Sequence, residues 1–540
     1  MSRFRSIHPL FFAVYPAAAL LANNLGQIDP VEAVRSVLVV VAGASALVVL
    51  LRLAVRDWPR AALITSMALL VFFSYGHVYG LLKSVSVGGV ILGRHRYLVP
   101  LALAGMAAWS WWAVRRVRET GTVGTLFNVA GAAALLFPAY SIGAYFLVAP
   151  RAAARPDLAA ASPASQAQAG TPSSGAQPDI YYIILDGYGR EDVLQDLYNC
   201  DNSGFLASLE QQGFYIAGGG RSNYLMTVLS LASSLNLQYL DDVAAVMGTG
   251  SDDQRPLADM VRHSTLRGFL AERGYRMVAF ESGWPLTEVA DADVYLTSDS
   301  AARSSFYLLG PPNEFEILLL RSTIIRSVLD KAQASVRTVD SPLEAPFGRH
   351  RSRILFVTDT LADIPGWQGD YFVFVHLVIP HPPFVFGPNG EPILHDREYS
   401  LSDGSAFEGT RAEYIAGYCG QVNYLDTLID RVVKRLIEGS ETPPVIILQG
   451  DHGPRASMDW HDPGRTNMRE AFGILNAYYF MGMRDPPLYP SVTPVNTFLI
   501  LLDLQFGQSY GLLPDESYYT ESDRPYDFLR MTDRAVTDGG

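Results

Sequence analysis

Two stretches of the chain place ligand-type side chains directly after a run of strand-forming residues. In PDIYYIILDGYGRED, residues 178–192, the run ends at Asp186, and in PPVIILQGDHGPR, residues 443–455, a second run ends at Asp451 and His452. Carboxylate oxygens and imidazole nitrogens are ligands of divalent cations such as Zn²⁺ or Mn²⁺. Because a lone Asp-Gly or Asp-His is more often a turn or a cap, the prediction of a metal site rests on the two runs together.

A third stretch offers hydroxyl groups. GGGRSNYLMTVLSLASSLN, residues 218–236, leads from glycines into a helix-like segment with Thr227 near its amino end. A hydroxyl at a helix N-terminus and beside a metal ion has a lowered pKa and a place for developing negative charge, which a weak nucleophile needs. By spacing alone, Thr227 and the serines that follow it could equally be caps or packing residues. These serines are Ser230, Ser233 and Ser234.

Two histidines lie in YFVFVHLVIPHPPFVFG, residues 371–387. His381 stands between prolines, in a rigid and extended segment that would hold an imidazole at the rim of a pocket. His376 lies inside the strand-like run and could be a satisfied core histidine. We therefore favour His381 as the functional one of the pair.

Helical and strand-like patterns alternate around these stretches, which predicts the element order that must position them. Such alternation is typical of a three-layer α/β/α sandwich with a mainly parallel central sheet. Ligands of such sheets bind at the carboxyl ends of the strands, and three of the strand-like runs end in chemically capable residues. The helix-like segments are 201–213 and 264–274, and the strand-like runs are 178–185, 275–280, 370–379, 443–449 and 476–481.

The first 150 residues have a different composition. They carry 12 Lys and Arg against 4 Asp and Glu, a net charge of +8; the whole chain is at −13, which leaves −21 for residues 151–540. So acidic a region is not expected to bind nucleic acid. Five apolar segments near the roughly 20 residues of a bilayer-spanning helix predict a membrane anchor over residues 1–150. These segments are 8–25, 36–55, 61–82, 97–114 and 124–148.

The basic residues beside these segments favour one orientation. With the N-terminus inside, eight arginines face the cytoplasm and four basic residues face the other side. Five spans would then place everything after residue 150 outside the cytoplasmic membrane. Residues 151–177 consist mainly of Ala, Pro, Ser, Gln and Gly and are predicted to be a flexible tether. A catalytic domain is expected over 178–540. Its two cysteines, Cys200 and Cys419, permit one disulfide, but two unpaired core residues are at least as consistent with the sequence.

The motifs IILDG, SNYxxTxxSLASSLN, PHPPF and GDHGP together resemble the membrane-anchored branch of the alkaline phosphatase and sulfatase superfamily. The resemblance covers residues 178 to about 515. Within that branch the chain is most similar to sulfatase-like proteins and to lipoteichoic acid synthase-type phosphoglycerol transferases, which also have a five-helix anchor. The resemblance implies an alkaline phosphatase-like fold.

The resemblance also implies roles for individual residues. Asp186, Asp451 and His452 would hold one divalent metal ion, Mn²⁺, Zn²⁺ or Mg²⁺, with Thr227 as the fourth ligand. Thr227 would also be the nucleophile that forms a covalent phospho-threonine. His381 matches the family's pocket histidine, which is expected to hold phosphoryl oxygens or protonate a leaving group. Further candidates for contact with the substrate are Arg221, Asn223, His376, Arg455 and His461.

Some features of the chain depart from parts of this superfamily. Classical sulfatases need a C/S-x-P-x-R motif for conversion to formylglycine, and neither CDNSG at Cys200 nor CGQVN at Cys419 offers it. Sulfate ester hydrolysis by that route is therefore not expected. Phosphoethanolamine transferases of the superfamily are usually rich in disulfides, so two cysteines argue against that subgroup.

The expected function is phosphoryl or phosphodiester transfer at the outer face of the cytoplasmic membrane. A lipid head group of the phosphoglycerol type would pass through Thr227 to an envelope glycan or lipid acceptor. One alternative is a phosphodiester or phosphomonoester hydrolase with the same residues and water as acceptor. The other is a non-catalytic membrane protein that retains the fold.

Overall fold

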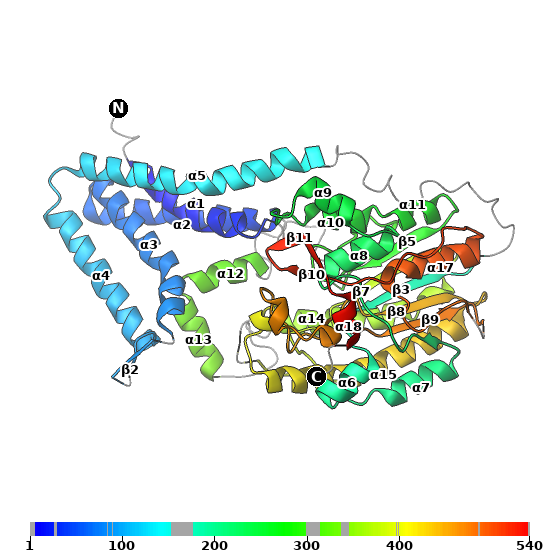
Figure 1. The fold of residues 1–540 in the computed structure, drawn as a ribbon. Helices are drawn as coiled ribbons and strands as arrows, with labels where there is room; N and C mark the ends of the chain where they lie inside the picture. Colours follow the sequence, from blue (N-terminus) through cyan, green and yellow to red (C-terminus); the bar gives the residue numbers. More distant parts are fainter. Residues whose placement is uncertain are drawn as a thin grey trace. The chain divides into compact units, whose positions relative to one another are not determined.

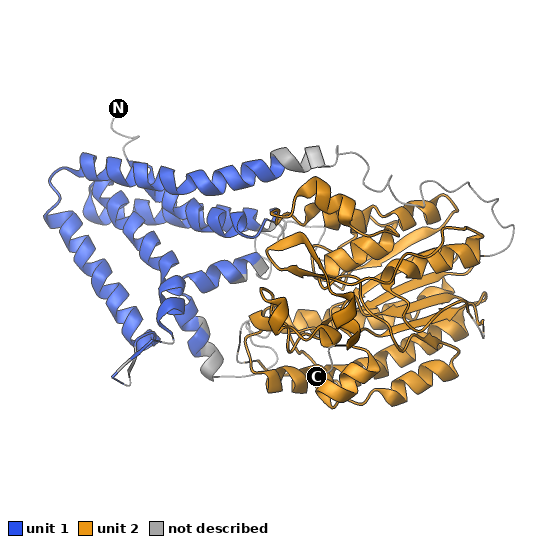
Figure 2. Ribbon diagram, viewed as in Figure 1, with its two compact units in different colours: residues 1–154, 305–337 blue, residues 155–304, 338–540 orange. Residues whose placement is uncertain are grey.

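The computed structural model divides into two compact units, which are described separately (Figure 2). We call residues 1–154 and 305–337 the helical unit, and residues 155–304 and 338–540 the sheet unit. The described residues are 6–25, 30–83, 85–88, 90–152, 177–298, 314–335, 345–395, 397, 399–483 and 486–537. Most of the predicted tether, residues 151–177, lies outside them.

Four described helices of the helical unit are long and apolar enough to cross a membrane. The first two are separated because Arg56 has a left-handed backbone at φ 59° and the Asp57 side chain then accepts the Arg60 N–H to begin the next helix. The four are α2 (Glu32–Val55), α3 (Trp58–Leu82), α4 (His95–Arg115) and α5 (Thr120–Ala152), with the strands β1 (Ser86–Val87) and β2 (Val90–Ile91) between α3 and α4.

The first predicted span is shorter than expected. Helix α1 (His8–Ala22) has 15 residues, about 22 Å at 1.5 Å per residue, against a hydrocarbon core of about 30 Å. It is packed among the other helices, with Ala13 and Ala17 at most 1 % exposed. The described residues thus contain four helices of spanning length where the sequence predicted five.

Two further helices belong to the helical unit although they lie within the predicted catalytic region. They are α12 (Glu314–Ser322) and α13 (Arg326–Ser335), drawn in green in Figure 1 and in blue in Figure 2. The sequence analysis did not predict that residues 305–337 group with the first 154.

The sheet unit is built on seven strands in the order β4-β9-β8-β3-β7-β5-β6. Strands β8, β3, β7, β5 and β6 are parallel, whereas β9 is antiparallel to β8 and β4 to β9. This confirms the predicted mainly parallel sheet. The strands are β3 (Ile180–Leu185), β4 (Tyr215–Ile216), β5 (Arg276–Phe280), β6 (Val294–Leu296), β7 (Tyr371–Leu377), β8 (Val445–Gln449) and β9 (Asn476–Phe480).

Helices cover both faces of this sheet (Figure 1). Alternate residues of β3 point to opposite sides, so Tyr181 and Ile183 lie in one buried cluster and Tyr182 and Ile184 in another. One face carries α6 (Glu191–Tyr198), α7 (Ser203–Gln211), α14 (Ala345–Leu361) and α15 (Arg411–Gly439), and the other α8 (Thr227–Leu235), α9 (Asp241–Met247), α10 (Arg255–Arg262), α11 (Thr265–Ala271) and α17 (Pro494–Phe506). The three layers match the predicted fold class.

The remaining elements surround the sheet. The hairpin of β10 (Tyr518–Glu521) and β11 (Arg524–Arg530) precedes the last helix, α18 (Thr532–Thr537). The short helices are η4 (Ile364–Gly366), η5 (Gly404–Ala406), η6 (Pro463–Arg465) and α16 (Met468–Phe472). Cys200 and Cys419 are both free thiols, and a hydrogen bond between them raises the pKa of Cys200.

Candidate active site

Three neighbouring strands supply the predicted metal ligands and the nearest histidine. Parallel pairing sets Ile184 of β3 beside Gln449 of β8 on one side and beside His376 of β7 on the other. Asp186 and Asp451 follow β3 and β8 by one and two residues, so their turns meet at the carboxyl edge of the sheet. The sequence motifs predicted this meeting correctly.

Asp186, Asp451 and His452 form a group whose ligand atoms all lie within 4.8 Å of one another. The His452 Nε2 atom is 3.1 Å from Asp186 Oδ1 and 3.4 Å from Asp451 Oδ2. All three residues are at most 1 % exposed, and none of these three atoms has a hydrogen-bond partner. Buried polar atoms that point at one another without hydrogen bonds are rare unless something binds between them.

Other polar atoms of Asp451 and His452 already have hydrogen-bond partners, and these show which ring nitrogen of His452 carries the proton. The Gly187 N–H donates to Asp451 Oδ1 at 3.0 Å. His452 Nδ1 lies 2.8 Å from the Gly453 carbonyl, which can only accept, so Nδ1 carries the proton. A neutral imidazole then turns the Nε2 lone pair toward two carboxylate oxygens, an arrangement that a divalent cation between them stabilises. The donor set fits one metal ion.

The charge of Asp186 is stabilised by three histidines. Burial alone would raise its pKa, but the neighbouring His381, His376 and His452 hold the pKa of Asp186 well below its usual range. His376 Nε2 lies 3.2 Å from Asp186 Oδ2, and His376 Nδ1 lies 2.9 Å from Thr287 Oγ1. His376 is therefore buried beside the candidate metal ligand, whereas the sequence analysis named it as a candidate for contact with the substrate.

Thr227 is the first residue of α8 and is 3 % exposed. Two contacts show the direction of this helix. Near its carboxyl end, Ser234 Oγ lies 3.2 Å from the hydroxyl of Tyr182 in β3, while just before its start the Leu225 carbonyl accepts a hydrogen bond from Arg455, in the turn after β8. The amino end of α8 therefore lies toward the carboxyl edge of the sheet, with its positive dipole end at Thr227.

His381 lies beside the group formed by Asp186, Asp451 and His452. Its ring centroid is 6.1 Å from that of His452, and its backbone N–H donates to the Asp186 carbonyl at 3.1 Å. Its Nδ1 lies 2.6 Å from the Pro382 carbonyl, which leaves Nε2 facing Asp403 Oδ2 at 3.4 Å. The imidazole is thus oriented by a carbonyl on one side and a carboxylate on the other.

Asp403 was missed by the sequence analysis. Besides His381, it faces Arg455, whose Nη1 is 3.5 Å from Asp403 Oδ2, and it is 4 % exposed. Arg455 also stacks over Trp460 at 4.8 Å, and its Nε has no hydrogen-bond partner although it is buried. Asp403 lies in SLSDGS, a polar stretch after no strand, so its type and spacing carry no signal that distinguishes it from a turn residue.

Two of the predicted substrate contacts are elsewhere engaged. Asn223 is fully buried and uses both ends of its amide, donating to the Glu516 carbonyl and accepting the Val495 N–H. It therefore holds the segment before α8 in place. His461 has a side chain 62 % exposed and lies 3.9 Å from Asp523. The described structure does not bring His461 together with the Asp186 group.

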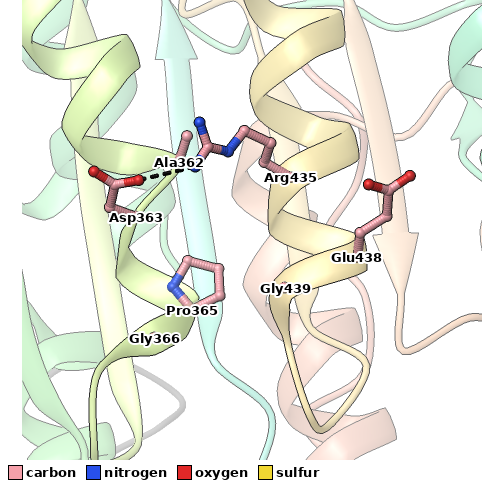
Figure 3. A pocket seen from close by; sticks show the side chains of 7 residues that line it. All are labelled: Ala362, Asp363, Pro365, Gly366, Arg435, Glu438 and Gly439. Atoms are coloured by element: carbon pink, nitrogen blue, oxygen red, sulfur yellow. Dashed lines mark hydrogen bonds and ion pairs between the residues drawn. The ribbon is translucent and has the colours of Figure 1, made fainter.

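A separate surface hollow of about 410 Å³ lies at the opposite edge of the sheet (Figure 3). Gly366 precedes β7 and Gly439 precedes β8, so its lining belongs to the amino ends of these strands. An ion pair between Asp363 and Arg435, 3.1 Å long, crosses it. None of the candidate site residues lines this hollow.

Several solved structures are similar to the chain at low sequence identity. The C-terminal periplasmic domain of EcEptC from Escherichia coli, in complex with Zn, is 13 % identical, with a TM-score of 0.39, 67 % of this chain and 94 % of that chain covered. The soluble domain of lipooligosaccharide phosphoethanolamine transferase A from Neisseria meningitidis is 12 % identical, with a TM-score of 0.36; the match covers 66 % of this chain and 95 % of that chain. Phosphonate monoester hydrolase of Agrobacterium radiobacter is 14 % identical, with a TM-score of 0.38; the match covers 63 % of this chain and 75 % of that chain.

No curated protein matches the chain. The model of the sulfatase family matches residues 178–483, more than half of the chain, and includes every residue of the Asp186 group as well as Thr227 and His381. The recognised motifs and the three-layer fold agree with this match. The protein is therefore an enzyme that belongs to the sulfatase family.

Proposed function

We propose that the protein is a metal-dependent phosphotransferase that moves a phosphoglycerol-type head group from a membrane lipid to an envelope glycan or lipid acceptor through Thr227. The observation that carries this proposal is the buried group of Asp186, Asp451 and His452. Its inward atoms lack hydrogen-bond partners, and the helix that begins at Thr227 points to the same edge of the sheet.

Each step of the proposed transfer can be assigned to residues of the site. A divalent ion, Zn²⁺, Mn²⁺ or Mg²⁺, held by Asp186, Asp451 and His452 would supply positive charge for phosphoryl oxygens. The Thr227 hydroxyl loses its proton to solvent, and its oxygen attacks phosphorus as the bond to the first alcohol breaks. A second alcohol then attacks the phospho-threonine and restores the free hydroxyl. The helix N-terminus at Thr227 favours the negative charge that forms there.

Two further residues act around the reacting group. His381 would donate a proton from Nε2 to the departing alcohol, while the Pro382 carbonyl holds Nδ1 and Asp403 faces Nε2. Arg455 has a buried Nε without a hydrogen-bond partner, which suits an oxygen of the phosphodiester. We assign His381 as general acid and Arg455 as the substrate-binding cation.

The proposed location rests on the charges of the loops of the helical unit, with α1 counted as a span. The loops α2–α3 and α4–α5 lie on the side of the membrane opposite to the end of α5. The segments 52–60 and 115–118 around them carry six arginines, whereas 83–96, around the α3–α4 loop, carries three basic residues. The positive side is cytoplasmic, so the sheet unit, which follows α5, is extracytoplasmic. Confinement at the same surface raises the rate of encounter with a lipid donor.

The test compares Thr227→Ala with Ser230→Ala in the full-length protein, because residues 305–337 belong to the helical unit and a truncated chain would lack their partners. Release of a chromogenic aryl alcohol from a bis-aryl phosphate is measured with Mn²⁺, Zn²⁺ or Mg²⁺. Ser230 lies one turn later in α8 and is equally buried, at 2 %. Loss of at least about a thousandfold is expected for Thr227→Ala alone, since removal of a nucleophile costs this much or more.

The donor and acceptor are tested with vesicles. Release of diacylglycerol from labelled phosphatidylglycerol, with phosphatidylethanolamine as the matched lipid, should depend on Thr227. Water as the final acceptor would yield free glycerol phosphate and make the protein a hydrolase. Activity equal in wild type and Thr227→Ala on every substrate would contradict the nucleophile, and absence of activity with metal bound would favour a non-catalytic role.

A further inference from the structure

The polypeptide passes between the two units at three places. It leaves the helical unit after residue 154, returns to it at 305 and leaves it again after 337 (Figure 2). The predicted tether is therefore only one of three covalent connections. The segment that lies between the other two connections makes extensive contacts with the first helices of the helical unit.

The apolar face of α12 is buried among the first helices of the helical unit. Phe315 is fully buried and Leu319 is 6 % exposed. They belong to one cluster with Phe12, Ala17, Leu21, Leu69 and Phe73, which come from α1 and α3. A helix on the surface of the sheet unit would not bury these side chains against α1 and α3.

A charged pair fixes the position of α12. The Arg35 guanidinium of α2 donates two hydrogen bonds to the Glu316 carboxylate, one from Nε at 2.5 Å and one from Nη2. Both side chains are at most 15 % exposed. Such a two-point pair between planar groups is specific in orientation, and the loss of either partner leaves a charge that is largely buried.

The turn between α12 and α13 lies directly against the backbone of α3. The Ile324 N–H donates to the Phe72 carbonyl at 2.9 Å. A Cβ on Gly76 would lie 2.3 Å from the Arg321 carbonyl oxygen and 2.7 Å from the Ser322 Cα. Only glycine allows this approach, whereas a Cβ on Gly80, one turn further along α3, would meet nothing within 4 Å.

Helix α13 is held by a polar cluster on α3 and α4. The His95 ring lies between Tyr75 and Asp330, with Nδ1 2.7 Å from the Tyr75 hydroxyl and Nε2 2.8 Å from Asp330 Oδ2. Tyr79 stacks on the same ring at 4.4 Å, and Arg326 lies over Tyr79 at 4.6 Å. The segment thus contacts the helical unit at both of its helices and at the turn between them.

We propose that residues 314–335 are a docking element that attaches the sheet unit to the membrane helices independently of the tether at residues 151–177. The partner that this surface fits is the group of helices α1–α4 of the same chain. The attachment goes beyond the proposed catalytic function and does not depend on it.

The experiment cuts the tether and asks what remains attached. A protease recognition sequence flanked by Gly-Ser segments is inserted between residues 160 and 170 of the full-length protein, and cleavage is verified by fragment size. We expect more than about nine-tenths of the C-terminal fragment to sediment with the membranes after cutting. In detergent it should also copurify with a tag on the N-terminal fragment, which separates docking from binding to lipid.

Matched variants test the contacts. Gly76→Leu should release most of the cut fragment, and Gly80→Leu should retain it. Arg35→Glu should release part of it, and Arg35→Glu combined with Glu316→Arg should restore retention, which keeps the test valid if Gly76→Leu fails to fold. Turnover of the soluble chromogenic ester shows that each sheet unit is folded. Release from the unsubstituted protein, copurification only in membranes, or equal behaviour of the two glycine variants would overturn the proposal.

Discussion

Strand β3 has an aspartate at each end, and the two carboxylates are in opposite situations. Before the strand, Asp179 accepts hydrogen bonds from the Tyr371 N–H at 2.8 Å and from the Tyr181 hydroxyl at 3.3 Å, and burial raises its pKa. After the strand, burial works in the same direction on Asp186, but three histidines reverse it and hold its pKa low, while Oδ1 lacks a hydrogen-bond partner. The amino edge of the sheet satisfies its own polar groups, whereas the carboxyl edge leaves some for a ligand.

The largest difference between the two edges is expected when the charge of each aspartate is removed. Asp186→Asn should lower turnover of the chromogenic phosphodiester about a thousandfold, because a bound cation contributes several kcal/mol of charge stabilisation and each 1.4 kcal/mol is a factor of ten. Asp179→Asn should change it less than twofold. Titration calorimetry with Zn²⁺ should show weakened binding only for Asp186→Asn. Retention of a tenth of the activity in that variant would contradict its role as a ligand.

The role of His381 at the same edge is tested with two leaving groups. His381→Gln should lower turnover about a hundredfold for an alkyl leaving group, since general acid catalysis contributes at least this much. A nitrophenyl leaving group needs no proton and should lose much less. Steady-state kinetics on both esters measures the ratio. An equal loss on the two esters would mean that His381 positions the substrate and does not protonate it.

A buried acid behind the carboxyl edge has a pH signature. Asp426 of α15 accepts the Tyr188 hydroxyl at 2.7 Å, and burial raises its pKa from 3.8 to about 8. Between these values the folded state holds a proton that the unfolded state lacks. The free energy of unfolding therefore falls by about 1.4 kcal/mol for each pH unit as the pH rises through this window.

Asp426→Asn should remove this slope, so the variant should gain stability over the wild type from pH 5 to pH 8. Limited proteolysis of the sheet unit across that range measures the difference. Asp430→Asn is the matched control, because Asp430 lies one turn later and its carboxylate pairs with Lys434 at 2.6 Å. A parallel pH dependence in wild type and Asp426→Asn would show that Asp426 titrates normally.

The smallest effect is expected at the amino edge. The Asp363–Arg435 pair has side chains 66 % and 58 % exposed. Arg435→Ala should therefore change the free energy of unfolding by less than about 0.5 kcal/mol and leave turnover unchanged. A tenfold loss of turnover in Arg435→Ala would show that the hollow in Figure 3 takes part in the reaction and would end the contrast between the edges.

The part of the site that could be predicted lies within one or two residues of a strand end. Asp186, Asp451 and His452 follow short apolar runs that favour a buried strand, and parallel pairing then brings the turns together. The start of α8 at Thr227 was also predictable from the glycines before it. The fold class followed from the same alternation.

What could not be predicted depends on long-range packing. Asp403 reaches His381 from a polar loop with no periodicity, and Thr287 reaches His376 from another. The segment 314–335 reads as an ordinary amphipathic surface helix pair until Phe315 and Glu316 are seen against the helical unit. The length of α1 was overestimated because the predicted span counted Asn23, Asn24 and Leu25, which follow the last helical residue.

The position of residues 305–337 in the chain constrains the order of biosynthesis. Strand β3, at the centre of the sheet, pairs with β7 about 190 residues later and with β8 about 265 residues later. Both partners are synthesised after residues 314–335, whereas the helices α1–α4 that contact α12 and α13 are synthesised before β3. The nascent chain can therefore complete its membrane helices and dock α12 and α13 while β3 still has no neighbour. The central sheet can close only after this docking. By then the polypeptide between α5 and α12, which contains β3, is attached to the membrane helices at both of its ends.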